Sequence, residues 1–168
     1  MSKISPLAFI DPEAKIGENC EIGPFCFIDK NVEIGDNNVL MNSVSVLYGA
    51  RIGNGNVIFP GAVISAVPQD LKFQGEDTTA EVGDNNKIRE NVTINRGTAA
   101  KGKTCVGSGN LLMESVHVAH DAFVGNDCII GNGTKLAGEI IIDDHAIISA
   151  NVLMHQFCRV GEIGRAHV

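Results

Sequence analysis

Tryptophan is absent from this 168-residue chain, and tyrosine occurs only once. No apolar run approaches the roughly 18 residues that a membrane span needs, and the opening segment MSKISPLAFIDPEAKIG lacks the apolar core of a signal peptide. The five cysteines show no CxxC or other zinc-like spacing. We therefore expect a cytoplasmic protein with no stable membrane insertion, no disulfide framework and no structural zinc.

Composition and charge narrow the class further. The formal net charge of -7 argues against a nucleic acid or an anionic membrane as the main partner. Nineteen glycines accompany abundant isoleucine, valine and asparagine, a bias that favours short strands joined by tight turns. The length allows one domain with its own core.

Apolar side chains recur at every sixth position in one phase, with two interruptions. The phase holds at 24 positions without an exception. The positions are Ile4, Ile10, Ile16, Ile22, Ile28, Ile34, Leu40, Val46, Ile52, Ile58 and Ile64, then Val82, Ile88 and Ile94, then Val106, Leu112, Val118, Val124, Ile130, Leu136, Ile142, Ile148, Met154 and Val160.

The residues between these positions fit sharp corners. A small residue often follows the aliphatic by four positions, and Cys20, Cys26, Cys128 and Cys158 stand there, where free cysteine acts as a compact filler. Glycine and asparagine recur in between, and both tolerate the left-handed backbone of a tight turn. The period predicts an all-β parallel β-helix with three hexads per coil, in which residues 18 apart stack. The general rule for parallel crossovers favours right-handed coils.

The two interruptions are predicted to be loops. They span roughly residues 65 to 81 and 95 to 105. A loop that leaves the corner of a rigid coil can line a groove, so we expect the functional chemistry beside these two segments.

Five segments carry a family resemblance. PQDLKFQGE, IRENVTINRGT, GSGNLLMESVHVAHD, KLAGE and HQFCRVG resemble, in order and separation, segments of the UDP-N-acetylglucosamine O-acyltransferases. The resemblance implies a left-handed parallel β-helix with two loop excursions, assembled as a homotrimer with active sites between subunits. It implies transfer of a (3R)-3-hydroxyacyl group from acyl carrier protein to the 3-hydroxyl of UDP-N-acetylglucosamine, the first step of lipid A biosynthesis. It implies no metal and no cofactor, because phosphopantetheine arrives on the carrier protein.

Three interpretations of His120 compete. A histidine on a coil face is often structural, and a zinc site of the γ-class carbonic anhydrase kind would need a third ligand, which the sequence around His117 and His120 does not offer. The resemblance implies a general base, which suits removal of a hydroxyl proton near neutral pH. Asp121 would orient the imidazole. Gly138, 18 residues on, would donate its N–H to an oxyanion, and Gln156 follows 18 residues later.

The resemblance also implies which residues contact the substrates, and two positions differ from the pattern of the family. The substrate-binding residues would be Gln69, Asp70, Lys72, His117, His155 and Gln156. Asp70 and Lys72 could instead be an ordinary exposed charge pair. Asn95 and Glu139 stand where family members often carry histidine, so acyl length preference stays open. The acidic carrier could dock on Arg96, Lys101, Lys103 and Arg159, although for any single one of them an ordinary solvated charge is the favoured interpretation.

The resemblance ends at Gly161. We therefore predict a catalytic β-helix over residues 1–161 and a tail or truncation junction over residues 162–168, with a carboxyl-terminal domain of the family missing. Two alternatives stay open. One is another hexapeptide acyltransferase, either the N-acyltransferase of the same pathway or a sugar acetyltransferase. The other is a non-catalytic β-helical fragment that trimerises or binds ligand weakly.

Overall fold

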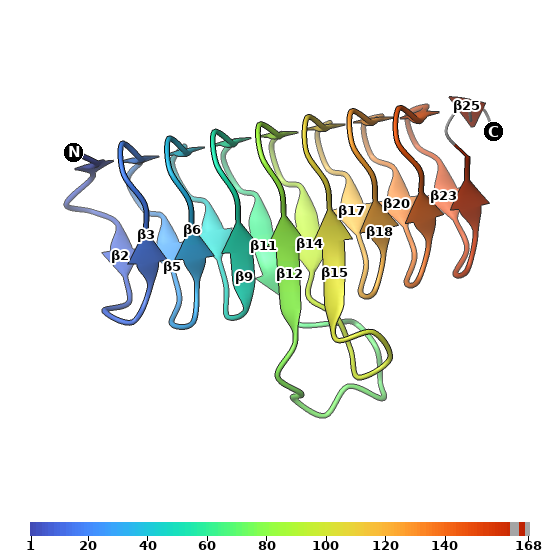
Figure 1. Ribbon diagram of the computed structural model, residues 1–168, viewed down its shortest axis with the longest axis horizontal. Helices are drawn as coiled ribbons and strands as arrows, with labels where there is room; N and C mark the ends of the chain where they lie inside the picture. The colour runs from blue at the N-terminus through green and yellow to red at the C-terminus, as the bar shows by residue number, and fades with distance from the viewer. Residues whose placement is uncertain (162–164, 167–168) are drawn as a thin grey trace.

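A computed structural model describes residues 1–161 and the strand at residues 165–166. The described residues wind into a left-handed parallel β-helix of short strands and turns, as Figure 1 shows. They include no helix long and apolar enough to cross a membrane. The predicted fold class is thus confirmed, including the hand that the resemblance implied.

Three parallel sheets form the walls of the prism, and each successive strand joins the next sheet. Sheet A contains β1 (Lys3–Ile4), β4 (Glu21–Ile22), β7 (Val39–Leu40), β10 (Val57–Ile58), β13 (Lys87–Ile88), β16 (Leu111–Leu112), β19 (Ile129–Ile130), β22 (Ile147–Ile148) and β25 (Arg165–Ala166). Sheet B contains β2 (Phe9–Ile10), β5 (Phe27–Ile28), β8 (Ser45–Val46), β11 (Val63–Ala66), β14 (Thr93–Asn95), β17 (His117–Val118), β20 (Lys135–Leu136) and β23 (Leu153–Met154). Sheet C contains β3 (Lys15–Ile16), β6 (Glu33–Ile34), β9 (Ala50–Ile52), β12 (Thr79–Val82), β15 (Lys103–Val106), β18 (Phe123–Val124), β21 (Ile141–Ile142) and β24 (Arg159–Val160).

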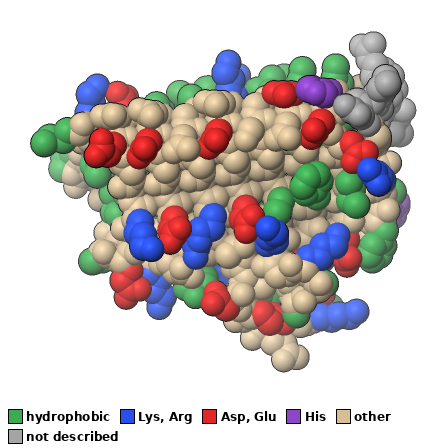
Figure 2. All heavy atoms as spheres, viewed as in Figure 1, with side chains coloured by type: hydrophobic (Ala, Val, Ile, Leu, Met, Phe, Trp, Pro, Cys, Tyr) green, Lys and Arg blue, Asp and Glu red, His purple; other side chains and the backbone are tan. Residues whose placement is uncertain are grey.

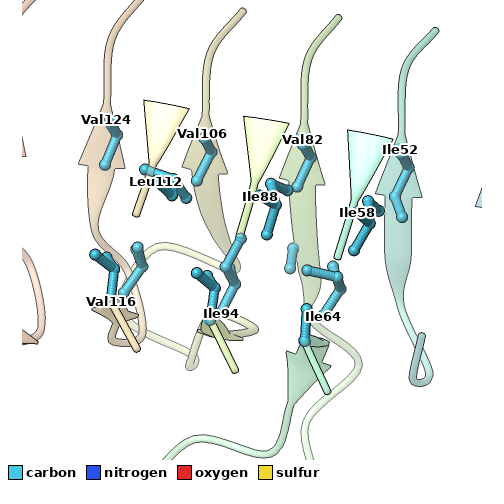
Figure 3. Packing of buried hydrophobic residues seen from close by; sticks show 14 of the residues in the cluster. Ile52, Ile58, Ile64, Val82, Ile88, Ile94, Val106, Leu112, Val116 and Val124 are labelled. Carbon is cyan, nitrogen blue, oxygen red and sulfur yellow. The ribbon is translucent and has the colours of Figure 1, made fainter. Parts of the chain in front are cut away.

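The six-residue period becomes an interior column of aliphatic side chains. Ile28 pairs in register with Val46, and Leu112 with Ile130, so residues 18 apart stack as the sequence predicted. Figure 3 shows part of this column, where Ile52, Ile58 and Ile64 point inward from the three walls. At the centre of the column Ile58, Ile88 and Ile94 are fully buried. Burial of each such side chain contributes about 1.5–3 kcal/mol.

The cysteines occupy two environments. All five are free thiols, and Cys20, Cys26 and Cys128 are buried fillers as expected. Cys158 is exposed, so its prediction as an interior filler is wrong: it lies in the last described coils, where its neighbours cover it poorly. Cys105 is half-buried on the outer face of sheet C.

Most corners use a left-handed residue three positions after the aliphatic. Asn37 has φ 58°, Asn91 has φ 57° and Asp121 has φ 59°. Asparagine and aspartate adopt this conformation more readily than most residues, which explains their frequency in the turns.

A buried asparagine ladder, which the period alone does not reveal, joins the coils at the corner between sheets C and A. The side chains of Asn38, Asn56, Asn86 and Asn110 are fully or almost fully buried and stack one above another. Each Oδ1 accepts the backbone N–H of the next rung: Asn38 to Asn56 at 2.8 Å, Asn56 to Asn86 at 2.9 Å and Asn86 to Asn110 at 2.9 Å. The ladder therefore satisfies backbone groups that the corner leaves without a strand partner.

Both excursions leave the same corner, between sheets B and C. The first, called here the long loop, comprises residues 67–78 between β11 and β12, and the short loop comprises residues 96–102 between β14 and β15. Strands reach further into the interruptions than the period predicted, since β11 continues to Ala66 and β12 begins at Thr79. Ile52 pairs with Val82, and Val82 with Val106, so the two coils are longer than usual by two hexads and by one.

The outer face of sheet C carries alternating charges, which cross the molecule in Figure 2. Lys15 contacts Glu33 at 2.8 Å, and Lys103 contacts Glu81 at 3.0 Å. Exposed pairs of this kind contribute little, about 0–1 kcal/mol each. These ion pairs are therefore compatible with the strand register but contribute too little to determine it.

Beyond Gly161, the predicted tail falls mostly outside the described residues. Residues 162–164 and 167–168 are not among them. The backbone of β25, at residues 165–166, pairs with β22 in the same parallel register as the preceding coils.

The asparagine ladder is testable by substitution. Asn86→Ala removes the acceptor of the Asn110 N–H in a buried setting, so we expect the free energy of unfolding to fall by about 1–3 kcal/mol. Asn42→Ala, at an exposed corner position, is the control and should change it by less than about 0.5 kcal/mol. Urea denaturation measures both, and equal effects would contradict a structural role for the ladder.

Candidate functional site

The site residues gather on the corner between sheets B and C, beside the two loops. His120 lies in the turn between β17 and β18, Gly138 in the turn between β20 and β21, and Gln156 in the turn between β23 and β24. The pairing of His117 with Lys135 and of Lys135 with Leu153 fixes their spacing at one coil each. The predicted alignment of these three residues along one corner is confirmed.

His120 and Asp121 contact each other although they are consecutive in the chain. His120 Nδ1 lies 2.8 Å from Asp121 Oδ2, and both side chains are buried. The left-handed backbone at Asp121 brings the two side chains together. When the neutral imidazole donates a hydrogen bond from Nδ1–H to the carboxylate, Nε2 carries the free lone pair and can act as a base.

The short loop encloses the Asp121 carboxylate. Thr98 donates its backbone N–H to Oδ1 at 3.0 Å and its hydroxyl to Oδ2 at 2.6 Å. The Lys101 backbone N–H points at Oδ1 from 3.3 Å. Because the Thr98 oxygen also accepts the Ala100 N–H at 3.2 Å, its single proton is directed to the carboxylate. The loop thus fixes the side chain that orients His120.

These contacts decide the charge of Asp121. Burial alone would raise its pKa, but the hydrogen bonds from Thr98 and His120 outweigh burial and hold the pKa of the carboxyl below its usual value. Asp121 is therefore an ionised, buried hydrogen-bond acceptor at neutral pH.

Gly138 lies directly beneath the His120 ring. A Cβ added to Gly138 would stand 2.6 Å from His120 Cε1 and 2.7 Å from Nε2. Any side chain here would displace the imidazole, so glycine is required by the close approach rather than by its backbone angles. No hydrogen bond joins the Gly138 N–H to another described residue.

Two hollows adjoin His120. One of ≈ 480 Å³ is lined by Gln69, Asp70, Leu71, Lys72, His120, Glu139, Gln156 and Phe157. The other, of ≈ 310 Å³, is lined by Gln69, His117, Ala119, His120, Lys135, Leu136, Ala137, Gly138, Leu153, Met154 and Gln156. The surface that lines the first hollow is more polar than the surface that lines the second. A further hollow of ≈ 480 Å³ lies on sheet C. The described residues that line it include no histidine, so it offers no imidazole base.

His117 lies beside the second hollow in a defined environment. Its Nδ1 lies 2.7 Å from Thr93 Oγ1. Burial, the nearby Lys135 ammonium and His120 lower the pKa of His117. At neutral pH it is therefore an uncharged hydrogen-bonding group.

The structure brings most of the predicted residues together and leaves one outside. Gln69, Asp70, Lys72, His117 and Gln156 line one or both hollows, whereas His155 is exposed and lines neither.

Three of the predicted docking charges already have partners within the chain. Lys101 Nζ donates to the Asp121 carbonyl, Lys103 pairs with Glu81 and Arg159 pairs with Asp143.

The sequence reasoning missed several contributors. Thr98 was not predicted because its partner Asp121 is 23 residues away across the short loop. Glu139, which the sequence marks only as a departure, places a carboxylate in the larger hollow, which Lys72 also lines. Within the described residues, no group of three or more histidine, cysteine, aspartate or glutamate side chains could hold a metal ion.

The chain is similar in sequence to known proteins, although it matches no family model. The chain is 46% identical over 162 residues to an acyl-(acyl-carrier-protein)–UDP-N-acetylglucosamine O-acyltransferase of Aliarcobacter butzleri, covering 96% of this chain and 62% of the relative.

Solved structures agree in fold as well as in sequence. A UDP-N-acetylglucosamine acyltransferase from Bacteroides fragilis is 75% identical with a TM-score of 0.92, over 94% of this chain and 62% of the other. The enzyme from Francisella novicida is 46% identical with a TM-score of 0.92, over 94% of this chain and 58% of the other. The chain thus spans about three fifths of these relatives.

The enclosure of Asp121 predicts a pH-dependent effect of Thr98→Val. Removing the hydroxyl donor should raise the pKa of Asp121 toward its unfolded value of about 3.9. A depressed carboxyl pKa stabilises the fold above the unfolded pKa, and this contribution disappears as pH falls through the folded pKa. The variant should therefore be less stable than wild type at pH 6, with a smaller difference at pH 3.

Urea denaturation at the two pH values measures this difference. Thr79→Val is the control, because the Thr79 hydroxyl has no hydrogen bond to a described residue. A Thr98→Val effect of equal size at both pH values would show that the hydroxyl does not stabilise the ionised carboxylate.

Proposed function

We propose that the chain is the β-helical catalytic part of a UDP-N-acetylglucosamine acyltransferase, on the strength of its 46% and 75% identity to two proteins of that name. It would transfer a (3R)-3-hydroxyacyl group from the thioester of acyl carrier protein to the 3-hydroxyl of UDP-N-acetylglucosamine, in lipid A biosynthesis. The observation that supports this most is the buried His120–Asp121 pair, which lies against Gly138 and beside both hollows.

In the proposed reaction His120 is the general base. Nε2 takes the proton of the sugar 3-hydroxyl while its oxygen attacks the thioester carbon. The C–S bond then breaks, and the imidazolium returns the proton to the departing carrier thiolate. Asp121 keeps Nδ1 protonated and stabilises the positive charge that develops on the ring.

The oxyanion of the tetrahedral intermediate would be bound by the Gly138 N–H. Four of the five prolines, Pro6, Pro12, Pro24 and Pro60, occupy the equivalent position two residues after an aliphatic in other turns. Proline has no N–H, so the coil does not need a donor at this position. The Gly138 N–H is thus available to a ligand, and a fixed backbone donor beside the base is suited to a developing negative charge.

The remaining residues would bind the substrates. Gln69, Asp70, Lys72 and Gln156 offer the polar contacts that a nucleotide sugar requires, while uncharged His117 offers a further hydrogen bond. His155 is exposed and lines neither hollow, so it would contact a substrate only outside them. Leu153 and Met154 give the smaller hollow an apolar wall suited to an acyl chain.

The proposal extends to partners and location. The acidic carrier protein would deliver the acyl group on its own phosphopantetheine, and the reaction uses no metal or resident cofactor. The subunits would form a homotrimer with active sites between subunits, in the cytoplasm. Among the candidate docking charges, neither Arg96 nor Lys101 forms an ion pair with an acidic side chain in the described chain.

Replacement of His120 tests the function directly. In the full-length protein, His120→Ala should lower transfer from 3-hydroxyacyl carrier protein to radiolabelled UDP-N-acetylglucosamine by about 10²–10⁴-fold. The control is His145→Ala, an exposed histidine at another corner, which should retain activity.

Three outcomes of this assay would contradict parts of the proposal. Full activity of His120→Ala would reject the general base. Wild-type binding of the nucleotide sugar without transfer would favour the non-catalytic alternative, and preference for an amino-sugar acceptor would favour an N-acyltransferase.

The close approach of Gly138 gives a second test. Gly138→Ala keeps the N–H but forces the His120 ring to move, and a displacement of about 1 Å can cost about 10²-fold in kcat. Asn42→Ala, at an exposed position on another corner, is the control. Steady-state kinetics of both variants decide the outcome: a Gly138→Ala enzyme with unchanged kcat would show that the ring position is not critical.

A further inference from the structure

The long loop is anchored at its ends but held at its tip by one residue pair. The tip, residues 69–76, carries Gln69, Asp70 and Lys72 of the larger hollow. Its hydrogen bonds are internal, as in the Lys72 N–H to Asp70 Oδ1 at 2.9 Å. Among the hydrogen bonds, ion pairs and ring contacts of the described residues, the one that joins the tip to the coil is the approach of Arg96 to the Phe73 ring.

Arg96 is placed between the coil and the loop. Its Cζ lies 5.4 Å from the centroid of the Tyr48 ring and 5.3 Å from that of Phe73. Nη1 donates weakly to the Tyr48 carbonyl at 3.4 Å, while Nε is buried without a hydrogen-bond partner in the described chain. The guanidinium is thus stabilised chiefly by aromatic faces rather than by a carboxylate.

The ends of the loop are fixed independently of this contact. Asn95 Nδ2 donates to the Val67 carbonyl at 2.5 Å at the start of the loop. At its end, Tyr48 donates to Asp77 Oδ1 at 3.1 Å, and Thr78 donates to the Gly97 carbonyl at 2.6 Å. Loss of the Phe73 contact would therefore free the tip without detaching the loop.

We propose that Arg96 and Phe73 form a latch that positions the tip of the long loop over the site. Both are positioning residues: they touch no hollow themselves, and they act through Gln69, Asp70 and Lys72. This inference rests on the proposed function for its substrate, the nucleotide sugar. Arg96 precedes Thr98 by two residues, so the short loop positions the substrate-binding loop with one residue and the Asp121 carboxylate with another.

Phe73→Leu tests the latch in the full-length protein, because it keeps apolar bulk and removes the ring. We expect the KM for UDP-N-acetylglucosamine to rise about 3- to 30-fold while kcat changes less than about 2-fold, as loss of one cation–π contact from substrate positioning implies. Trypsin cleavage after the exposed Lys72, followed by mass spectrometry, should become faster. Arg96→Lys, which retains the charge, should show a smaller effect in the same direction.

The chain provides a matched control at another corner. Arg89 Cζ lies 4.4 Å from the Phe59 ring, remote from both loops in the turn region after β10 and β13. Phe59→Leu should change neither the KM nor the cleavage after Lys72. If it changes them as much as Phe73→Leu does, the effect is a general loss of stability and the latch is rejected.

The remaining outcomes are also decisive. Unchanged cleavage and KM in Phe73→Leu would overturn the latch, and faster cleavage with an unchanged KM would overturn its role in the site. If wild-type protein shows no transfer, the proposed function fails, and calorimetric binding of UDP-N-acetylglucosamine replaces the KM. If that binding is also absent, cleavage after Lys72 alone decides whether Arg96 and Phe73 hold the loop.

Discussion

The stacking of one aliphatic side chain per hexad upon the next fixes the length of every coil. A coil with one residue too many would turn its apolar side chain outward, because alternate residues of a strand face opposite sides of the sheet. The backbone hydrogen bonds between coils, such as Phe27 N–H to the Val44 carbonyl at 2.9 Å, require the same register. At one corner the hydrogen bonds of the asparagine ladder also require successive coils to stay in register. These three features therefore require coils of 18 residues, or of 18 residues plus whole hexads.

The site satisfies this constraint by placing irregular segments on one corner only. The long and short loops lengthen their coils by whole hexads, so the columns resume in phase beyond them. A rigid scaffold then presents His120, Gly138 and Gln156 at intervals of one coil, while the loops supply contacts that strands cannot make. Thr98 illustrates the division: a residue of the short loop holds a carboxylate that belongs to a regular turn.

The sequence predicts the features that recur with the six-residue period. It does not predict features that depend on one contact between a loop and the coil. The period was sufficient for the sheets, the stacking and the alignment of His120 with Gly138, because each follows from counting. The Thr98–Asp121 and Arg96–Phe73 contacts could not be counted, since the path of an irregular loop decides them. The asparagine ladder lies between: its members stand 18, 30 and 24 residues apart, and the spacing becomes regular only once the two insertions are placed. The exposure of Cys158 depends on how neighbouring coils cover it, which the period does not state.

The pairing of each coil with its immediate neighbours has a consequence for the order of folding. Strands bond to partners 18, 24 or 30 residues away, so a coil can dock as soon as the following stretch of chain is available. Loop closure costs entropy that grows with separation, and the slowest steps should be the two coils that contain the insertions. The residues of the site lie at and beyond these coils. The amino-terminal coils can thus serve as a template during synthesis, and the site can form only after the chain has passed the two longest closures.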